Sequence, residues 1–181
     1  MSAARWRIVR RRTPRKGQAL VEFGMVFGLF MLVMGGLVQF GIILWSQNAI
    51  TQVARDTARW AVTQSTSPCD TAASRTRVAA VADQLAGGAS LVAYSAGIWN
   101  SAAPIGSLGA EGVGVNWQSV NSTFPSDCPP SNNATVWTVR VRINHVVPIF
   151  LPGLKLIAPP CSAAGFCLTS TTELRMEPKK P

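Results

Sequence analysis

The most prominent pattern in the chain is a long apolar run near its amino end. Residues 23–38 hold sixteen consecutive positions without a charge or a side-chain amide, and the run resumes after Gln39 as far as Trp45. A helix needs about 20 mainly apolar residues to cross a bilayer, and it pairs its own backbone amides, as lipid requires. The pattern therefore predicts one membrane-spanning helix over residues 18–45.

The helical pattern continues beyond Trp45 as an amphipathic stretch. No proline or glycine interrupts residues 42–67, and small or apolar residues recur three and four positions apart. This spacing places them on one face of a helix. We expect a single helix from about residue 19 to about residue 63, half in lipid and half covering a soluble domain. The predicted covering face consists of Ala49, Ile50, Val53, Thr57, Trp60 and Ala61.

The remainder of the chain predicts a short helix followed by strands. Residues 71–88 suit the helix, and residues 89–97 and 112–120 suit short strands. Residues 136–148 give the clearest strand because apolar and polar side chains alternate, and residues 166–178 return beside it. The expected fold class is α+β: a long transmembrane-to-amphipathic helix packed on a small antiparallel sheet, with a short second helix.

The formal net charge of +9 is concentrated at the amino end of the chain. Seven lysines and arginines precede Gly17 without an acid, whereas ten basic residues face eight acidic ones from Gln18 onward. Such a basic flank is held on the cytoplasmic side of a membrane. A nucleic-acid interface would instead need basic residues interleaved with aromatics on a folded face. We expect a cytoplasmic amino terminus, an extracytoplasmic domain and no nucleic-acid partner.

The sequence lacks the patterns of an active site or a metal site. The single histidine, His145, continues the apolar side of its strand and is expected in the core or at its rim. The acidic residues are dispersed, without the signature of paired catalytic carboxylates. We therefore expect no catalytic residue, no metal, no cofactor and no small-molecule substrate.

The four cysteines form no Cys-x-x-Cys pair, and with one histidine they make a zinc site improbable. An even number in a membrane-crossing chain favours disulfides in an oxidising compartment. The spacing favours a local bridge between Cys161 and Cys167, which leaves Cys69 and Cys128 to join two loops. Three pairings are arithmetically possible.

The segment KGQALVEF, residues 16–23, places Glu22 at the edge of the apolar run. A carboxylate costs about 2.5 to 3.5 kcal/mol at the centre of a span and less near the interface, so it is retained where it has a partner or a task. A solvated glutamate paired with Arg15 or Lys16 is the simpler interpretation. Two other fates of the leader compete with this interpretation. One is conventional signal cleavage near residue 50, which would release a secreted enzyme. The other is a permanent, uncleaved membrane anchor.

The same segment resembles the processing site of type IV pilin-like proteins. They carry a basic leader, a glycine, and a mature chain whose fifth residue is glutamate followed by an aromatic; here these are Gly17, Gln18 as the new first residue, Glu22 and Phe23. The resemblance implies that a prepilin peptidase cuts after Gly17. It also implies that Glu22 pairs with the new amino terminus of a neighbouring subunit.

One side of the apolar helix carries small residues. Gly24, Gly28, Gly35 and Gln39 fall on one face at 100° per residue. Small side chains allow a second helix to approach closely, and a polar one can form a hydrogen bond across the interface. We expect this face to take part in assembly.

A longer resemblance covers GQALVEF, FGIILW and QNAITQVARDTARWAV, within residues 17–62. Together these pieces resemble the TadE-like family, the pseudopilins of the tight-adherence (Tad) pilus of bacteria, and residues 171–177 resemble the end of such chains. The resemblance implies a leader over residues 1–17, a transmembrane helix over 18–45 and an extracytoplasmic TadE-like α+β domain over 46–181.

The family implies a structural or assembly role, as a minor pilin or pseudopilin in pilus biogenesis and adhesion. The implied partners are a prepilin peptidase, other Tad pilins or pseudopilins, and the inner-membrane assembly platform. The expected location is the inner membrane, crossed once with the carboxy-terminal domain in the periplasm, with incorporation into an extracellular pilus as a further step. The alternative is an uncleaved single-span protein whose periplasmic domain binds a ligand or partner.

Overall fold

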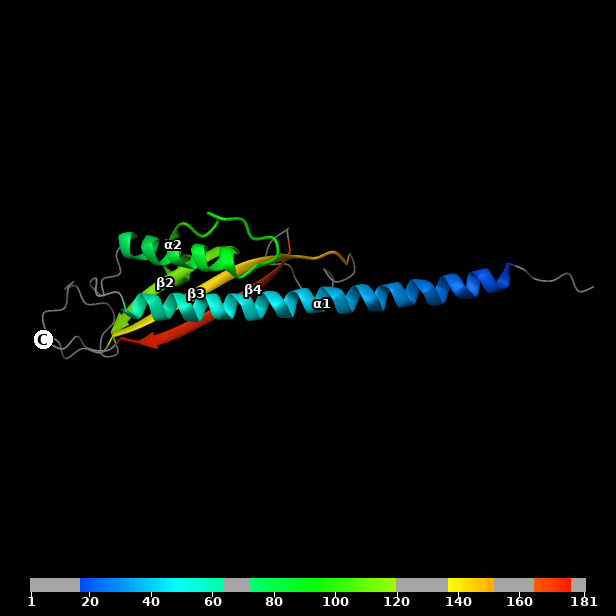
Figure 1. The fold of residues 1–181 in the computed structure, drawn as a ribbon, viewed down its shortest axis with the longest axis horizontal. Helices are drawn as coiled ribbons and strands as arrows, with labels where there is room; N and C mark the ends of the chain where they lie inside the picture. Colours follow the sequence, from blue (N-terminus) through cyan, green and yellow to red (C-terminus); the bar gives the residue numbers. More distant parts are fainter. Residues whose placement is uncertain (1–16, 64–71, 120–136, 152–164, 177–181) are drawn as a thin grey trace, which may run out of the picture. The chain divides into compact units, whose positions relative to one another are not determined.

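The computed structural model describes residues 17–63, 72–119, 137–151 and 165–176. Internal contacts divide the chain into two units, residues 1–37 and 38–181. The elements, shown in Figure 1, are α1 (Gln18–Thr63), α2 (Ala72–Gly88), β1 (Ala102–Ala103), a short 3-10 helix η1 (Ile105–Ser107), β2 (Gly112–Ser119), β3 (Trp137–Pro148) and β4 (Gly165–Arg175). The predicted α+β class, with its long first helix and short second helix, is confirmed.

The described part of the first unit is the amino-terminal half of α1. Its large apolar side chains from Leu20 to Leu37 are all exposed. An 18-residue window of the helix has a mean hydropathy of 2.2 and is only 6% buried, so by length and composition α1 is a candidate membrane span near the amino terminus. These side chains need lipid or neighbouring helices to cover them.

The second unit is built on a four-stranded sheet in the order β1-β2-β3-β4. The three long strands are antiparallel, with Val115 opposite Val141 and Val141 opposite Thr172. The short edge strand β1 runs parallel to β2, which makes the sheet mixed rather than purely antiparallel. The predicted alternation on β3 is confirmed: alternate residues from Trp137 to Ile143 are buried, and those between are half-buried.

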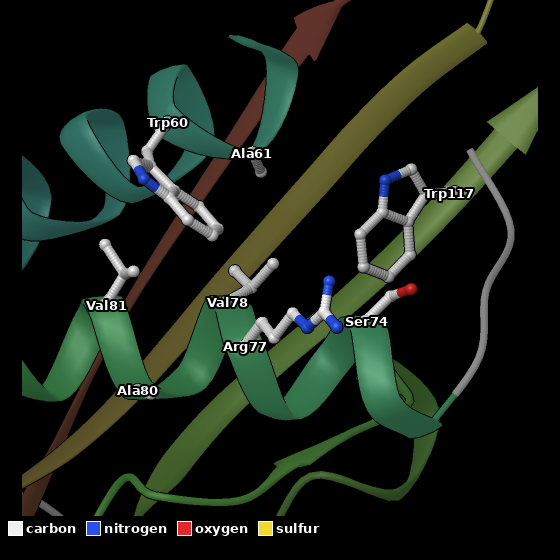
Figure 2. A pocket seen from close by; sticks show the side chains of 8 residues that line it. All are labelled: Trp60, Ala61, Ser74, Arg77, Val78, Ala80, Val81 and Trp117. Atoms are coloured by element: carbon white, nitrogen blue, oxygen red, sulfur yellow. The ribbon is translucent and has the colours of Figure 1, made fainter. Parts of the chain in front are cut away.

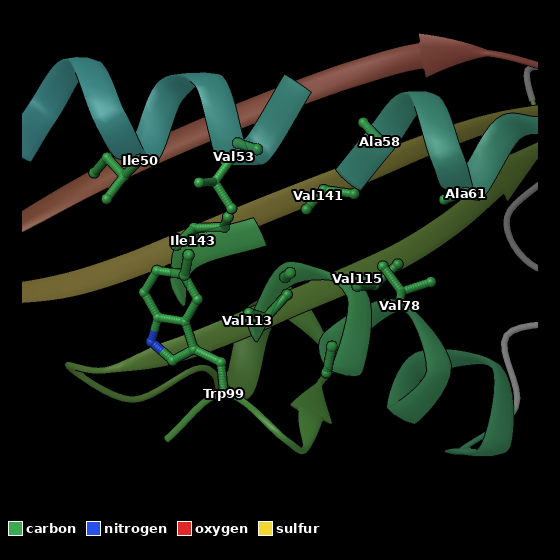
Figure 3. Packing of buried hydrophobic residues seen from close by; sticks show 14 of the residues in the cluster. Ile50, Val53, Ala58, Ala61, Val78, Trp99, Val113, Val115, Val141 and Ile143 are labelled. Carbon is green, nitrogen blue, oxygen red and sulfur yellow. The ribbon is translucent and has the colours of Figure 1, made fainter. Parts of the chain in front are cut away.

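Both helices cover one face of this sheet, and one hydrophobic cluster joins them to the strands (Figure 3). The second half of α1 contributes the predicted stripe, in which Ile50 and Thr57 are fully buried. Ala54 and Ala58, which the predicted stripe did not include, are fully buried as well. Of that stripe only Trp60 stays partly exposed. The small alanines of both helices leave room in the shared core for larger strand side chains such as Val141.

The strand predicted over residues 89–97 is wrong, because this segment forms turns. Ser90 and Ala93 have φ angles of 51° and 62°, in the left-handed region that strands do not use. The segment's polar groups are paired locally: the carboxylate of Asp83 accepts hydrogen bonds from the backbone N–H of Gly97 and from the hydroxyl of Tyr94. Pairing of this kind removes the need for a neighbouring strand.

The other face of the sheet is partly covered by η1. A Cβ on Gly114 of β2 would lie 3.1 Å from Cα of Ile105, so glycine is what lets η1 approach the strand. The side chain of Asn116 fixes this contact by accepting a hydrogen bond from the backbone N–H of Ile105 at 3.1 Å.

Candidate functional site

The predicted processing segment forms the start of α1. The backbone N–H of Val21 donates to the carbonyl of Gly17 at 3.2 Å, so helical pairing begins at the glycine. Gln18 Nε2 donates to Glu22 Oε1 at 3.0 Å, and both side chains are exposed. Arg15 and Lys16, the alternative partners of the carboxylate, lie outside the described residues. The structure thus places Gln18 and Glu22 within the first two turns of α1, with Gly17 directly before the helix.

The predicted small-residue face is open at its first two glycines, Gly24 and Gly28. A Cβ built on Gly24 or on Gly28 meets no atom within 4 Å, whereas Gly35 is half-buried. Phe23, the predicted aromatic of the motif, stacks on Phe27 with ring centroids 5.7 Å apart. Another helix could approach the two open glycines, and their role in assembly stays a prediction.

Gln39 differs from the glycines because its side chain is satisfied within the chain. It is 2% exposed. Its Nε2 donates to the carbonyl oxygen of Pro148 at 3.1 Å, and its Oε1 accepts from the backbone N–H of Phe150 at 3.0 Å. The amide, which stands out in an apolar run, therefore ties α1 to the segment that follows β3.

A buried polar network, which was not predicted from the sequence, lies at the carboxy-terminal end of β3. Glu111 Oε1 is 2.7 Å from His145 Nδ1 and accepts from Trp99 Nε1 at 3.1 Å. Its Oε2 accepts from the backbone N–H of Val146 at 2.8 Å. On the other side of the ring, His145 Nε2 is 2.9 Å from the carbonyl oxygen of Val92.

Both ring nitrogens of His145 thus face groups that only accept hydrogen bonds, which favours the imidazolium form. Burial lowers the pKa of His145, but the hydrogen bond and negative charge of Glu111, together with the Val92 carbonyl, raise it above its ordinary 6.5. The ring is fully buried and meets Trp99 edge to face, with centroids 5.9 Å apart. The expectation of a core histidine is confirmed, with an ion pair added.

A second carboxylate organises the turns next to this network. Asp83 of α2 accepts from the hydroxyl of Tyr94 at 2.5 Å and from the backbone N–H groups of Gly97 and Trp99 at 2.8 and 3.1 Å. Burial raises the pKa of Asp83, but these hydrogen bonds outweigh it and hold the pKa below its ordinary 3.8. Burial and the neighbouring Asp83 raise the pKa of Tyr94. These hydrogen bonds hold the backbone of Trp99 in place, and the indole of Trp99 in turn donates to Glu111. The role of Asp83 is therefore structural.

A cavity of about 270 Å³ lies between the two helices and β2 (Figure 2). Trp60 and Trp117 line it, with Arg77 and Ser74 as its polar members. Among the residues that the structure describes, those that line the cavity include no acid and no histidine. Among the described residues no cluster of three or more histidine, cysteine, aspartate or glutamate side chains could hold a metal ion.

Of the four predicted disulfide cysteines, only Cys167 lies within the described residues. It sits on β4, where its Sγ is 3.9 Å from the carbonyl oxygen of Ala110. Cys69, Cys128 and Cys161 lie outside the described part of the chain, so the predicted disulfide connectivity stays a prediction.

Comparison with known proteins identifies the amino-terminal segment. Neither the curated proteins nor the solved structures provide a match to the chain. The family model described as "TadE-like protein" matches residues 17–59. The match begins at Gly17, spans the apolar run and ends at Arg59, in the amphipathic stretch of α1. The resemblance inferred from the motifs is confirmed over residues 17–59, about a quarter of the chain, where the sequence is similar to the TadE-like family. The resemblance noted at residues 171–177 lies outside this match and stays a prediction.

Proposed function

We propose that the protein is a minor pilin or pseudopilin of a Tad-type pilus, with a structural role and no catalytic turnover. The observation that carries the proposal is the TadE-like match, which begins at Gly17 and contains a glutamate five residues later. The proposed partners are a prepilin peptidase, other Tad pilins or pseudopilins, and the membrane assembly platform. The proposed location is the inner membrane, with the domain in the periplasm and later in a pilus.

The chemistry of assembly follows from the start of α1. Cleavage after Gly17 would turn the backbone nitrogen of Gln18 into an ammonium group at the end of the helix. The exposed carboxylate of Glu22 is then available to an ammonium group on a neighbouring copy. In a medium of low dielectric constant such a pair is strong, whereas an unpaired carboxylate is costly. Pairing would therefore select the register in which two helices pack.

The exposed side chains of α1 supply the remaining driving force. The open surfaces at Gly24 and Gly28 allow a neighbouring helix to approach, and the surrounding apolar side chains would exchange lipid for protein contacts. The sheet domain would face neighbouring subunits or the surroundings, where adhesion takes place.

Processing is tested by intact-mass measurement of protein extracted from membranes of cells with and without the peptidase. Loss of the first seventeen residues only when the peptidase is present supports the proposal, and a Gly17→Val variant should keep its full length. A full-length chain in both cells would contradict it and favour a permanent anchor. A chain that begins near residue 50 would point to conventional signal cleavage.

Assembly is tested by the amount of protein in sheared filaments. Glu22→Gln should reduce it strongly while membrane content stays unchanged, and Glu22→Asp should retain part of it. Asp56→Asn is the matched control, since it neutralises an exposed carboxylate on the same helix beyond the apolar run. Equal amounts from Glu22→Gln and Asp56→Asn would refute the pairing role.

A further inference from the structure

The segment after β3 is attached to α1 where the apolar run is interrupted by an amide. Gln39 binds the carbonyl of Pro148, the last residue of β3, and the N–H of Phe150, which follows the strand. Backbone groups outside a helix or closed barrel are tolerated near hydrocarbon only when protein groups satisfy them. The two hydrogen bonds of Gln39, called the clamp below, satisfy the carbonyl of Pro148 and the N–H of Phe150.

The length of the helix before the clamp matches the thickness of a bilayer. Residues 18–38 are twenty-one helical residues, and at 1.5 Å each they extend about 31 Å, close to the roughly 30 Å of hydrocarbon in a membrane. If these residues fill the hydrocarbon layer, the lipid boundary falls beside Gln39. This boundary lies about two turns earlier than the apolar pattern to Trp45 indicates.

Large apolar side chains gather around this level in the second unit. Phe40 is 63% exposed, Leu44 52%, Trp45 61% and Phe150 66%. Relative to the buried Gln39, Phe40 and Leu44 point to one flank of the helix, and Trp45 points to the opposite flank. A single protein partner would cover one flank, whereas a membrane interface surrounds the helix at one depth. Aromatic side chains are enriched at that depth.

We infer that Phe150 inserts into the lipid interface beside α1, and that Gln39 clamps its segment there. The occupant of this surface is the bilayer, at the boundary between head groups and acyl chains. The inference rests on membrane anchoring through α1 and is independent of pilus assembly. It assigns Phe40, Leu44, Trp45 and Phe150 to one interfacial belt, and it gives Gln39 a positioning role.

The test places the photoreactive residue benzoylphenylalanine at position 150 of the full chain, in nanodiscs of phosphatidylethanolamine and phosphatidylglycerol. Illumination should give a lipid adduct detectable by mass spectrometry. The matched control carries the probe at Arg175, which is exposed on β4 and pairs with Thr138, ten residues along β3 from Pro148. That offset is about 34 Å, so the control should give no lipid adduct.

A lipid yield at position 150 no higher than at position 175, or adducts mainly with a second copy of the chain, would overturn the inference. The clamp is tested separately by adding Gln39→Met, which keeps the size of the side chain but removes both hydrogen bonds. This change should reduce the lipid adduct at position 150, whereas Gln52→Met, at an exposed amide of the same helix, should not. An undiminished adduct in Gln39→Met would overturn the positioning role.

Discussion

The ion pair between Glu111 and His145 allows a worked prediction for Glu111→Gln. The carboxylate accepts from three donors: the ring of His145 and the indole of Trp99 on Oε1, and the backbone N–H of Val146 on Oε2. Glutamine has one oxygen and one NH₂ group. Whichever way the amide is turned, its NH₂ group faces at least one N–H, so at least one buried donor loses its acceptor.

The expected cost is about 2 to 3 kcal/mol of unfolding free energy. A buried donor left unpaired costs about 1 to 3 kcal/mol, and loss of charge assistance adds to it. Removing one partner of a fully buried ion pair would cost about 3 to 5 kcal/mol. That upper range is reduced here, because the side chain of Glu111 is 26% exposed and water can relieve part of the loss.

The destabilisation should depend on pH with a definite sign. Because the pKa of His145 is raised in the folded state, its contribution is fully present below the unfolded value of 6.5 and is lost as pH rises through the folded pKa. Without the negative charge of Glu111, burial still lowers the pKa of His145 and the Val92 carbonyl opposes it less strongly than the full set of partners did. The difference between wild type and Glu111→Gln should therefore be larger near pH 6 than near pH 9.

The assay is urea unfolding of the full chain in a nonionic detergent, followed by tryptophan fluorescence at both pH values. Glu173→Gln is the control, since it breaks the Arg140–Glu173 pair at 2.7 Å, whose side chains are 41% and 42% exposed. Exposed pairs contribute less than about 1 kcal/mol. The reasoning is refuted if Glu111→Gln costs no more than this control, or if its cost grows from pH 6 to pH 9.

Three further predictions use the same unfolding assay. Asp83→Asn should lower the free energy of unfolding by about 1 to 2 kcal/mol at neutral pH. This loss should shrink in acid, because the stabilisation that comes from the lowered pKa of Asp83 disappears as pH falls through the folded pKa. A loss that does not depend on pH would contradict the prediction. Gly165→Ala should destabilise by more than about 2 kcal/mol, because its Cβ would collide with the carbonyl of Val147, and unchanged stability would show that the strands separate freely there. Ser46→Ala should be neutral or stabilise by up to about 1 kcal/mol, since the buried hydroxyl has no hydrogen-bond partner among the described residues, and a loss above that size would reveal a missed partner.

The elements with strong periodicity could be predicted from the sequence. The three- and four-residue spacing from Ala49 to Ala61 and the alternation from Trp137 to Ile143 each record a single dominant contact, with the sheet or with the helices. The segment over residues 89–97 has a strand-like composition, but its structure depends on a carboxylate at Asp83 that satisfies its donors. Periodicity contains no information about such a partner.

The candidate sites divide in the same way. The predicted processing motif at Gly17 and Glu22 is local in sequence, so a few neighbouring residues suffice to propose it. Glu111 and His145 are 34 residues apart and meet only because β2 and β3 pair in register, so no local pattern identifies them. Gln39 and Phe150 are separated by 111 residues, and the only sequence signal is an unexplained amide in an apolar run.

The shared core of α1 and the sheet has a consequence for biosynthesis. The face of α1 from Ala49 to Ala61 leaves the ribosome early, whereas β3 and β4, which complete the sheet beneath it, are made last. About a hundred residues must be added while this amphipathic face has no partner. Amphipathic helices bind readily to membrane surfaces. The second half of the nascent α1 can therefore lie on the bilayer surface, next to the apolar first half, until the strands are made. The domain can close only when this half of the helix leaves the bilayer surface.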